Sequence, residues 1–586
     1  MTPGRKAKAA WILLAFLATL ASAGSSTAAG DDPAVPGLSR GETLRLGERM
    51  YRDGILPSGE PLTATLYGGI HIEGTMFSCV SCHLRSGLGS FEGGVLTPPT
   101  NGVVLYKPWN SSREDSRLWK GNLEGAGGLR TRSMYYVWMG SMEMMAAQRN
   151  APLYNLYRFG KYPGRPAYTD ETVADAIRGG ANPDGREFIG VMPRYTFDDR
   201  DLAILIAYLK SLSKDLSPGV TETTIRFATV VTEEVNRKER DALLASLERY
   251  FLSHNARLLQ QEAIHADPDF RRISLVLWEL KGPPETWRGQ LEEYYRKDPV
   301  FALLGGISTK EWRPIHEFCE ENAIPCLLPI TDLPVVSATS WYTLYFSKGF
   351  YQEGETAARH LARTEDSDPG RTVVQVYPDT PEGKAFAFGF RDAWSETGRG
   401  PLVEKVIPAG GAVTRGYLEE AIGGQRRAVL VLWTGAEAFP ALEAMGGGDG
   451  GGTTVYLSGT LLKDRLLSVP EALRERTYIT YPYRLTDSAL GTGVGETSPE
   501  ITDRRIGGKV GSLIAVLNEV FGAWRSNFYR DYMYDIIDTS MLVVYSPFER
   551  ISFGPGQRYA SKGCYIVRLS KGAKPELVGK TDWVVY

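Results

Sequence analysis

The sequence predicts a multidomain protein in which an all-α domain is followed by a two-lobed α/β domain with parallel sheets. Apolar residues recur at helical spacing near both ends of the first part of the chain. Further along, strands and helices alternate, and the alternation restarts near residue 371. A chain of 586 residues also exceeds the size of one hydrophobic core. The predicted divisions are a signal peptide over 1–29, the all-α domain over 30–212, a linker over 213–224 and the α/β domain over 225–586.

The N-terminus has the pattern of a secretory signal peptide. Arg5, Lys6 and Lys8 form a basic start, and residues 11–20 form a short apolar core followed by small residues. The apolar core is too short for a comfortable membrane span, and no later segment is apolar for long enough. We therefore expect an exported, periplasmic protein with no membrane span after signal cleavage. The net charge of -3 gives no reason to expect a nucleic-acid partner.

The run Cys79-Val80-Ser81-Cys82-His83 is a c-type haem attachment motif. The thiols of Cys79 and Cys82 can both add to the vinyl groups of one porphyrin, and His83 can then ligate the iron. No second Cys/His pair has the spacing that would complete a zinc site. The motif occurs once, so the sequence predicts one covalently attached haem c and excludes a dihaem peroxidase.

The flanking segments resemble class I-type cytochromes c. An amphipathic helix is predicted over 41–51, and Asp198-Asp199 can cap a second helix that ends near Leu212. Between them lie Asp184-Gly185-Arg186 and Val191-Met192-Pro193-Arg194-Tyr195. The resemblance implies that the two helices pack together and that Met192 is the sixth iron ligand, opposite His83. Such a pair raises the haem potential and suits electron transfer.

Other sixth ligands stay open at this stage. A group of methionines, for which core packing is the favoured role, comprises Met134, Met139, Met142, Met144 and Met145. His71 is the one other histidine of this domain, in a Gly-rich stretch that favours a surface or strand position. The segment over 103–165 is longer than small cytochromes need, and it is expected to wrap the haem or meet a neighbour.

The second domain begins after a polar segment broken by Pro218-Gly219. Strand and helix patterns alternate through it. Strands are predicted over 225–231, 273–278, 300–306, 324–328, 371–377, 428–433 and 454–458, and helices over 237–254, 287–296, around Cys319 and over 382–396. This order predicts parallel sheets with right-handed crossovers.

This part of the chain resembles type I periplasmic binding proteins, particularly the leucine-binding group. The resemblance rests on residues 303–309, 323–327, 377–384 and 389–390. It implies a small solute between two lobes, held at strand-to-helix turns where helix N-termini favour an anion. The solute-binding candidates are Ser308, Thr309, Tyr377, Asp379 and Trp433, with Asp332 and Tyr342 as looser ones.

Alternatives accompany these candidates. Ser308 and Thr309 can simply cap a helix, a role compatible with binding. The aromatic pair Trp341-Tyr342 favours a larger or aromatic solute over a plain amino acid. Cys319 and Cys326 are close enough in sequence to form a disulfide, which the sequence does not decide. No nucleophile–base pair can be placed, so an electron carrier or solute-binding protein is favoured over an enzyme.

Three functions remain for the whole chain. The first is a periplasmic monohaem cytochrome that exchanges one electron with a dehydrogenase or cytochrome partner and binds a small molecule through its C-terminal domain. The second is a solute receptor whose haem senses redox state or a gas, which predicts a labile Met192 bond. The third, least favoured because no second cofactor is indicated, is an oxidoreductase whose haem takes electrons from bound substrate.

Overall fold

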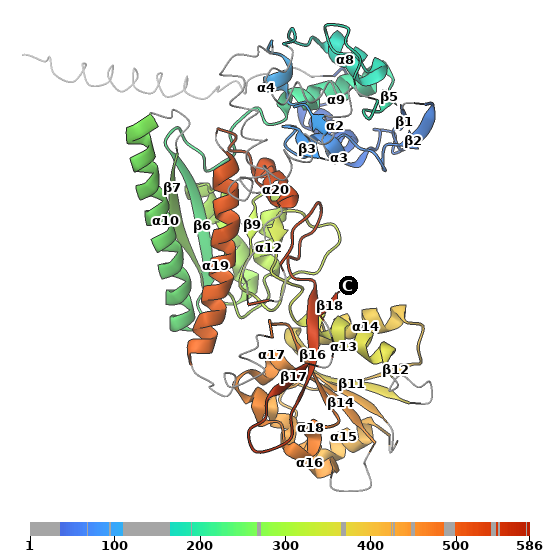
Figure 1. The fold of residues 1–586 in the computed structure, drawn as a ribbon, viewed down its shortest axis with the longest axis vertical. Coiled ribbons are helices and arrows are strands. Elements are labelled where there is room, and N and C mark those ends of the chain that lie inside the picture. The colour runs from blue at the N-terminus through green and yellow to red at the C-terminus, as the bar shows by residue number, and fades with distance from the viewer. Residues whose placement is uncertain are drawn as a thin grey trace, which may run out of the picture. The chain divides into compact units, whose positions relative to one another are not determined.

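The structure, a computed structural model, describes most of the chain from residue 35 to residue 585. The residues outside the description are 1–34, 67, 93–94, 109–163, 189, 266–270, 365–370, 424, 426–427, 447–451, 486–498, 525, 541–546, 549–550, 580, 582 and 586. The predicted signal peptide and the group of methionines over 134–145 therefore lie outside the described residues. The described residues form two compact units, which divide between Asp215 and Leu216 (Figure 1).

In the N-terminal unit, helix α2 (Arg40–Asp53) packs against helix α9 (Asp199–Ser211), which confirms both predicted helices. The Asp198 carboxylate caps α9 by accepting a hydrogen bond from the Asp201 backbone N–H at 2.7 Å. Gly47 allows the helices to meet closely, because a Cβ atom there would lie 2.4 Å from Cβ of Tyr208. The two ends of this unit are thus joined through one helix pair.

The expectation of an all-α domain is wrong for this unit. Besides helices, it contains a three-stranded antiparallel sheet in the order β2-β1-β5 and a β3–β4 hairpin. Gly68 and Gly69 have φ of 88° and 79° and make the tight turn between β1 and β2. The strands are β1 (Thr63–Leu66), β2 (Ile70–Glu73), β3 (Ser90–Glu92), β4 (Val95–Thr97) and β5 (Arg194–Thr196), and the other helices are α3 (Val80–His83), α4 (Gly102–Leu105) and α8 (Asp170–Gly179).

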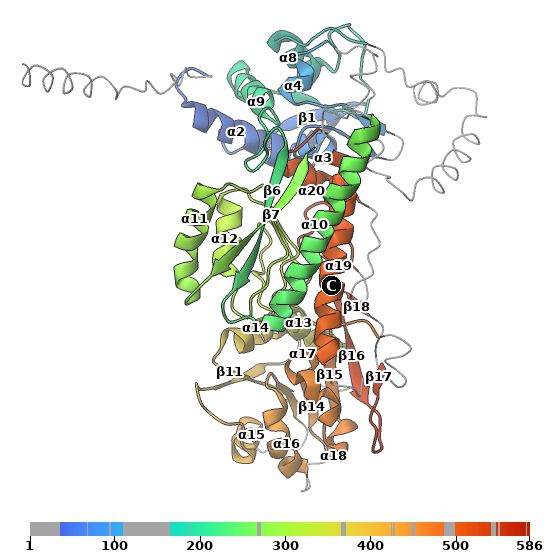
Figure 2. The same ribbon diagram turned by 90° about the vertical axis from the view of Figure 1, so that its left-hand side faces the viewer.

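The C-terminal unit has two lobes, and the first is built on a parallel sheet in the order β10-β9-β8-β6-β7. Its strands are β6 (Thr224–Thr232), β7 (Arg272–Leu280), β8 (Ala302–Leu304), β9 (Cys326–Leu327) and β10 (Thr343–Leu344). Helices α10 and α19 lie on one side of the sheet, and α11 and α12 lie on the other (Figure 2). The helices are α10 (Arg237–His265), α11 (Trp287–Lys297), α12 (Arg313–Glu321), α19 (Pro499–Trp524) and α20 (Arg530–Thr539).

The second lobe has a sheet in the order β12-β11-β13-β14-β15-β16-β17, with β18 paired to β16. Strands β11 to β15 are parallel, as predicted, whereas β16 and β17 return antiparallel. The strands are β11 (Val373–Pro378), β12 (Leu402–Ile407), β13 (Val429–Leu432), β14 (Thr454–Ser458), β15 (Thr477–Tyr481), β16 (Gly563–Leu569), β17 (Leu577–Gly579) and β18 (Val584–Val585). The helices are α13 (Phe350–Arg363), α14 (Pro381–Glu396), α15 (Arg415–Ala421), α16 (Phe439–Gly446), α17 (Gly459–Leu462) and α18 (Glu471–Arg474).

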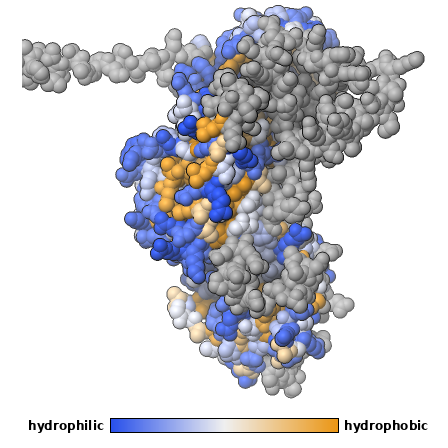
Figure 3. Space-filling model, turned by 60° about the vertical axis from the view of Figure 1, so that its left-hand side comes forward, coloured by the Kyte–Doolittle hydropathy of each residue, from blue (hydrophilic) through white to orange (hydrophobic). Residues whose placement is uncertain are grey.

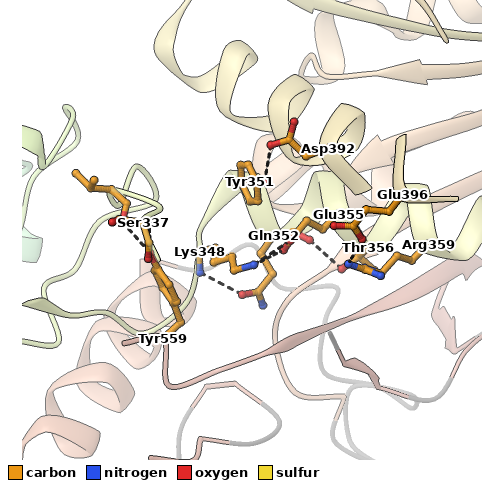
Figure 4. Close-up of polar contacts among 11 residues, drawn as sticks. Ser337, Lys348, Tyr351, Gln352, Glu355, Thr356, Arg359, Asp392, Glu396 and Tyr559 are labelled. Atoms are coloured by element: carbon orange, nitrogen blue, oxygen red, sulfur yellow. Dashed lines mark hydrogen bonds and ion pairs between the residues drawn. The ribbon is translucent and has the colours of Figure 1, made fainter. Parts of the chain in front are cut away.

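The chain passes between the lobes three times. The first crossing follows β10, the second follows β15, and the third leads from α20 to β16. The first and third are paired: the Tyr345 N–H donates to the carbonyl of Arg558 at 2.8 Å, and the Ala560 N–H donates to the carbonyl of Tyr345 at 2.9 Å. Lys348 of the first crossing forms an ion pair with Glu355 of α13 at 2.9 Å (Figure 4). These contacts hold the first and third crossings together, and we call the three crossings the hinge segment.

Apolar surface gathers on the first lobe, where β7 forms the edge of the sheet (Figure 3). The exposed apolar side chains of this lobe include Leu252 and Leu259 of α10.

The Asn255 side-chain amide covers part of the edge strand β7. It donates a hydrogen bond to the carbonyl of Ile273 at 2.9 Å and accepts one from the Ile273 N–H at 3.0 Å. Asn255 therefore satisfies backbone groups of the edge strand that would otherwise be open to another strand.

One described helical stretch, Arg505–Trp524 of α19, is long and apolar enough by composition to cross a membrane, so the expectation that no later segment is apolar for long enough was wrong by this measure. Half of this apolar stretch is buried inside the protein. Leu513, Leu517 and Val520 are each at most 1% exposed. This helix therefore has the burial expected of a core helix.

Candidate functional site

The predicted haem motif lies on the short helix α3 of the N-terminal unit. Cys79 and Cys82 are free thiols and partly exposed, whereas His83 is buried. Nδ1 of His83 lies 2.8 Å from the carbonyl oxygen of Pro98. A carbonyl can only accept, so Nδ1 carries the proton and Nε2 keeps its lone pair for a metal. Burial lowers the pKa of His83 to about 4, which favours the neutral imidazole that a metal ligand requires.

Large apolar side chains near this motif are exposed, as a haem-binding surface requires. Met76 and Phe77, three and two residues before Cys79, are 71% and 38% exposed, and Val191, next to Met192, is 54% exposed. An apolar macrocycle would remove such surfaces from water. The orientation of His83 and these apolar residues both fit a covalently attached haem.

The predicted sixth ligand, Met192, is half-buried in the turn before β5. The hydroxyl of Tyr195 on β5 donates to the carbonyl of Phe77 at 2.6 Å. This bond ties the Met192 loop to the segment that precedes Cys79. Ligation by Met192 stays a prediction. His71 is exposed on β2, and its Nδ1 lies 3.3 Å from the hydroxyl of Thr65.

In the first lobe, Ser308 and Thr309 follow β8 at the carboxyl edge of the sheet, and both hydroxyls face Glu234. The Ser308 hydroxyl lies 3.3 Å from a Glu234 carboxylate oxygen, and that of Thr309 lies 3.4 Å from it. Thr232, at the end of β6, donates to the same oxygen at 2.6 Å. Sequence reasoning missed Glu234, although an acidic pair directly after a buried strand was the available signal. The Ser308 turn therefore faces a carboxylate of the protein itself, whereas the family resemblance predicted an anionic group of the solute there.

The three predicted residues of the second lobe lie at or near the carboxyl edge of its sheet, with different surroundings. Asp379 is exposed and pairs with Lys384 at 2.6 Å. Tyr377 is buried in the core of the lobe. Trp433 is also fully buried, and its indole N–H donates to Gln375 at 3.2 Å. Solute contact by these residues stays a prediction.

Thr434, the residue after Trp433, has a buried side-chain hydroxyl that is free to bond a solute. Its side chain is 6% exposed, and its hydroxyl has no hydrogen-bond partner among the described residues. It follows β13, on the same edge of the sheet as Asp379. A buried hydroxyl without a partner costs free energy unless another group pairs with it. Thr434 therefore offers a buried, unpartnered hydroxyl at the carboxyl edge of the second-lobe sheet.

The three crossings meet in an aromatic cluster, which we define as Phe346, Tyr483 and Phe548, one residue from each crossing. Phe346 stacks on Phe548 with ring centroids 5.8 Å apart, and Tyr483 stacks on Phe548 at 5.7 Å. Two cations of α19 reach the cluster. Arg505 lies 4.0 Å from the centroid of the Tyr483 ring, and Lys509 lies over Phe346 and Phe548.

A buried carboxyl, Glu353 of α13, lies beside this hinge. It accepts hydrogen bonds from Ser458, the last residue of β14, at 2.8 Å and from Thr480 of β15. Burial raises the pKa of Glu353 to about 7, and the Asp332 carboxylate adds to the rise. Glu353 is therefore held near its titration midpoint at neutral pH.

Cys319 and Cys326 are both free and fully buried. The side chain of Cys326 is within hydrogen-bond reach of Cys319, and burial raises the pKa of the Cys319 thiol well above its usual value. As the structure describes them, these two residues are adjacent thiols in the core of the first lobe.

Part of the C-terminal unit is similar to a known protein family. The family model for periplasmic binding proteins matches residues 271–490. This part of the chain carries a periplasmic-binding-protein domain. The two-lobed fold with parallel sheets predicted from the sequence is thereby confirmed for the C-terminal unit. Binding proteins of this family are typically exported to the periplasm.

Solved structures of solute-binding proteins are similar to the chain at low identity. A fatty acid ABC transporter substrate-binding protein from Thermomonospora curvata is 14% identical, with 64% of this chain and 95% of that chain covered and a TM-score of 0.42. A Rhodopseudomonas palustris protein in complex with 3,4-dihydroxybenzoic acid is 13% identical, with coverages of 62% and 97% and a TM-score of 0.43. A Thermus thermophilus branched-chain amino acid protein with bound valine is 13% identical, with the same coverages and a TM-score of 0.44. Among curated proteins, no sequence matches the chain.

Proposed function

We propose that this chain is an exported solute receptor in which a periplasmic-binding-protein domain binds a small molecule and an N-terminal unit carries one haem c. The observation that carries the proposal is the family match over residues 271–490, on a unit whose chain crosses between two lobes three times. The carboxyl edges of both sheets supply polar groups for a solute, with Glu234 on the first lobe and Thr434 on the second.

The haem part of the proposal rests on the chain's own residues. Cys79 and Cys82 would hold the group covalently, while His83 and Met192 would ligate its iron. A haem supplies reversible one-electron chemistry when bound. Pro98 orients His83 through Nδ1, and the exposed apolar residues Met76 and Val191 would exclude water from one side of the group.

A periplasmic electron carrier is the second candidate function. The sequence places it first, because a His83/Met192 pair suits electron exchange with a dehydrogenase or cytochrome. The family match favours the receptor, since a binding-protein domain has solute recognition as its own task. The receptor and the electron carrier would use the same haem residues. They differ in whether binding of a solute changes the redox or conformational state of the protein.

A thermal unfolding screen of the full-length protein against amino acids, aromatic acids, fatty acids and sugars tests the receptor. We expect at least one compound to stabilise the protein increasingly with its concentration, by about 2.7 kcal/mol at one hundred times its Kd. Glu234→Gln should weaken this effect, whereas the matched control Glu292→Gln, on the exposed face of α11, should preserve it. If no compound stabilises the protein, the receptor function is wrong.

A further inference from the structure

Cys319 and Cys326 place two thiols side by side in the core of the first lobe. Both side chains are fully buried, and both belong to the apolar cluster that the sheet forms with α11 and α12. The side chain of Cys326 is within hydrogen-bond reach of that of Cys319. The pair is not part of a metal site, because the described residues hold no group of three or more cysteine, histidine, aspartate or glutamate side chains that could bind an ion.

The backbone between the two thiols reverses tightly from helix to strand. Cys319 lies in the last turn of α12, on one side of the sheet (Figure 2), and Cys326 is the first residue of β9. The Ile324 N–H donates to the carbonyl of Cys319 at 2.8 Å, and Ala323 has a φ of 49° at the reversal. The reversal returns the chain beneath α12, so that the two cysteines meet.

Cys326 is held on both sides within the sheet. Its Cα pairs with that of Leu303 on β8 and with that of Thr343 on β10. Its N–H donates to the carbonyl of Tyr342 at 2.7 Å. A disulfide requires Cα atoms within about 7 Å of each other and Cβ atoms that face each other. Because the two side chains already meet, a bond between their sulfurs requires little movement of the backbone.

The expected compartment favours oxidation of this pair. Disulfides form and persist in the periplasm, whereas cytosolic thiols are kept reduced. The N-terminal signal pattern and the family match both point to export. Burial raises the pKa of the Cys319 thiol well above its usual value, which suppresses the thiolate that disulfide exchange requires. The exchange therefore has to take place before the core of the lobe closes.

We propose that Cys319 and Cys326 form a disulfide bond as the exported chain folds, and that this bond fastens α12 to β9. One thiolate attacks the disulfide of a periplasmic protein thiol oxidant, and the second cysteine then displaces the oxidant from the mixed disulfide. The two cysteines lose two protons and two electrons, and the oxidant's disulfide is reduced to two thiols. The inference rests on the export included in the proposed function, and it needs neither the haem nor the solute.

The bond has a consequence for the candidate solute site. Helix α12 is the first helix after the Ser308 turn, which follows β8. A covalent link from α12 to the adjacent strand limits how far the segment after this turn can move when the chain fluctuates. The disulfide would therefore hold the first-lobe part of the site in place.

The other cysteines lie in other parts of the chain. Cys79 and Cys82 are on α3 of the N-terminal unit, where the proposed haem would occupy both sulfurs. Cys564 is fully buried on β16 of the second lobe. All five cysteines are among the described residues, so the proposal predicts one disulfide inside the first lobe and one free thiol at Cys564.

A count of free thiols in the full-length protein purified from the periplasm tests the bond. The protein is unfolded in guanidinium chloride with iodoacetamide, and its mass is measured with and without prior reduction by dithiothreitol. One thiol, that of Cys564, should react without reduction, and three should react after it. A protease that cleaves after glutamate tests the pairing, because Glu320 and Glu321 separate the two cysteines. The two fragments should stay joined until they are reduced.

Cys319→Ser should raise the number of thiols that react without reduction from one to two, because Cys326 loses its partner. The matched control Cys564→Ser should lower that number to zero and leave the two fragments joined. Wild-type protein in which Cys319 and Cys326 both react without reduction would overturn the proposal, and this result needs no variant. Two further reactive thiols, at Cys79 and Cys82, would refute haem attachment, while joined fragments would still support the disulfide.

Discussion

Replacing Arg530 by methionine is expected to lower the free energy of unfolding of the binding-protein domain by about 3–5 kcal/mol. The Arg530 guanidinium is 7% exposed at the start of α20 and holds together segments that are far apart in the sequence. It donates to the carbonyls of Val300 at 2.7 Å, Phe301 at 2.9 Å, and Asn322 and Ala323 at 3.1 Å, and to the Tyr295 hydroxyl at 3.2 Å. Methionine keeps the apolar stem but leaves these acceptors without a donor.

Denaturant unfolding followed by circular dichroism measures this effect. Arg288→Met is the matched control, because Arg288 is partly exposed and bonds only with surface carboxylates among the described residues. Its loss should cost less than about 1 kcal/mol. Equal stabilities of the two variants would show that Arg530 does not hold the lobe together.

The binding-protein domain is expected to lose stability as the pH rises from about 4.5 to about 7, because Glu353 titrates inside it. Its pKa is raised from 4.5 to about 7 in the folded protein. Between these values the folded state binds a proton that the unfolded state has released, so unfolding becomes easier as pH increases. The full effect is about 3 kcal/mol, and it is complete above the folded pKa.

Glu353→Gln should flatten this part of the stability–pH profile, since glutamine keeps the shape and does not titrate. The hydroxyls of Ser458 and Thr480 can rotate to meet the amide. Glu396→Gln is the control: Glu396 lies on the surface of α14 in an ion pair with Arg359. Denaturant unfolding at several pH values measures both variants. A variant Glu353→Gln with the wild-type slope would contradict the assignment.

The sequence predicted the alternation of strands and helices in the C-terminal unit well, because that pattern is local. Period-two and period-3.6 apolar patterns report directly on burial of each strand and helix. The all-α expectation for the N-terminal unit was wrong because its strands are only three or four residues long. A strand of that length depends on its partners: β5 pairs with β1 across more than a hundred residues of sequence.

The candidate sites were predicted in part, because the sequence shows contiguous motifs and does not show contacts between distant segments. The haem motif is contiguous, so it was evident, but the Pro98 carbonyl that orients His83 became apparent only in three dimensions. Glu234 and Ser308 come from separate segments of the chain that converge on one edge of a sheet. Ser308 suggested an anion site, and only the neighbouring carboxylate of Glu234 shows that the charge there is negative.

The central claim is that one receptor joins a solute-binding domain to a covalently attached haem, and the midpoint potential of the haem tests it most directly. The potential is measured on the full-length protein with and without a saturating amount of the solute found by the thermal screen. Linkage requires a shift of about 59 mV for each tenfold difference in solute affinity between the ferric and ferrous forms. The variant with Cys79→Ala and Cys82→Ala should bind the solute and show no covalent haem spectrum. A shift of tens of millivolts is the predicted result, and an unchanged potential at saturation, or wild-type protein without covalent haem, would contradict the account.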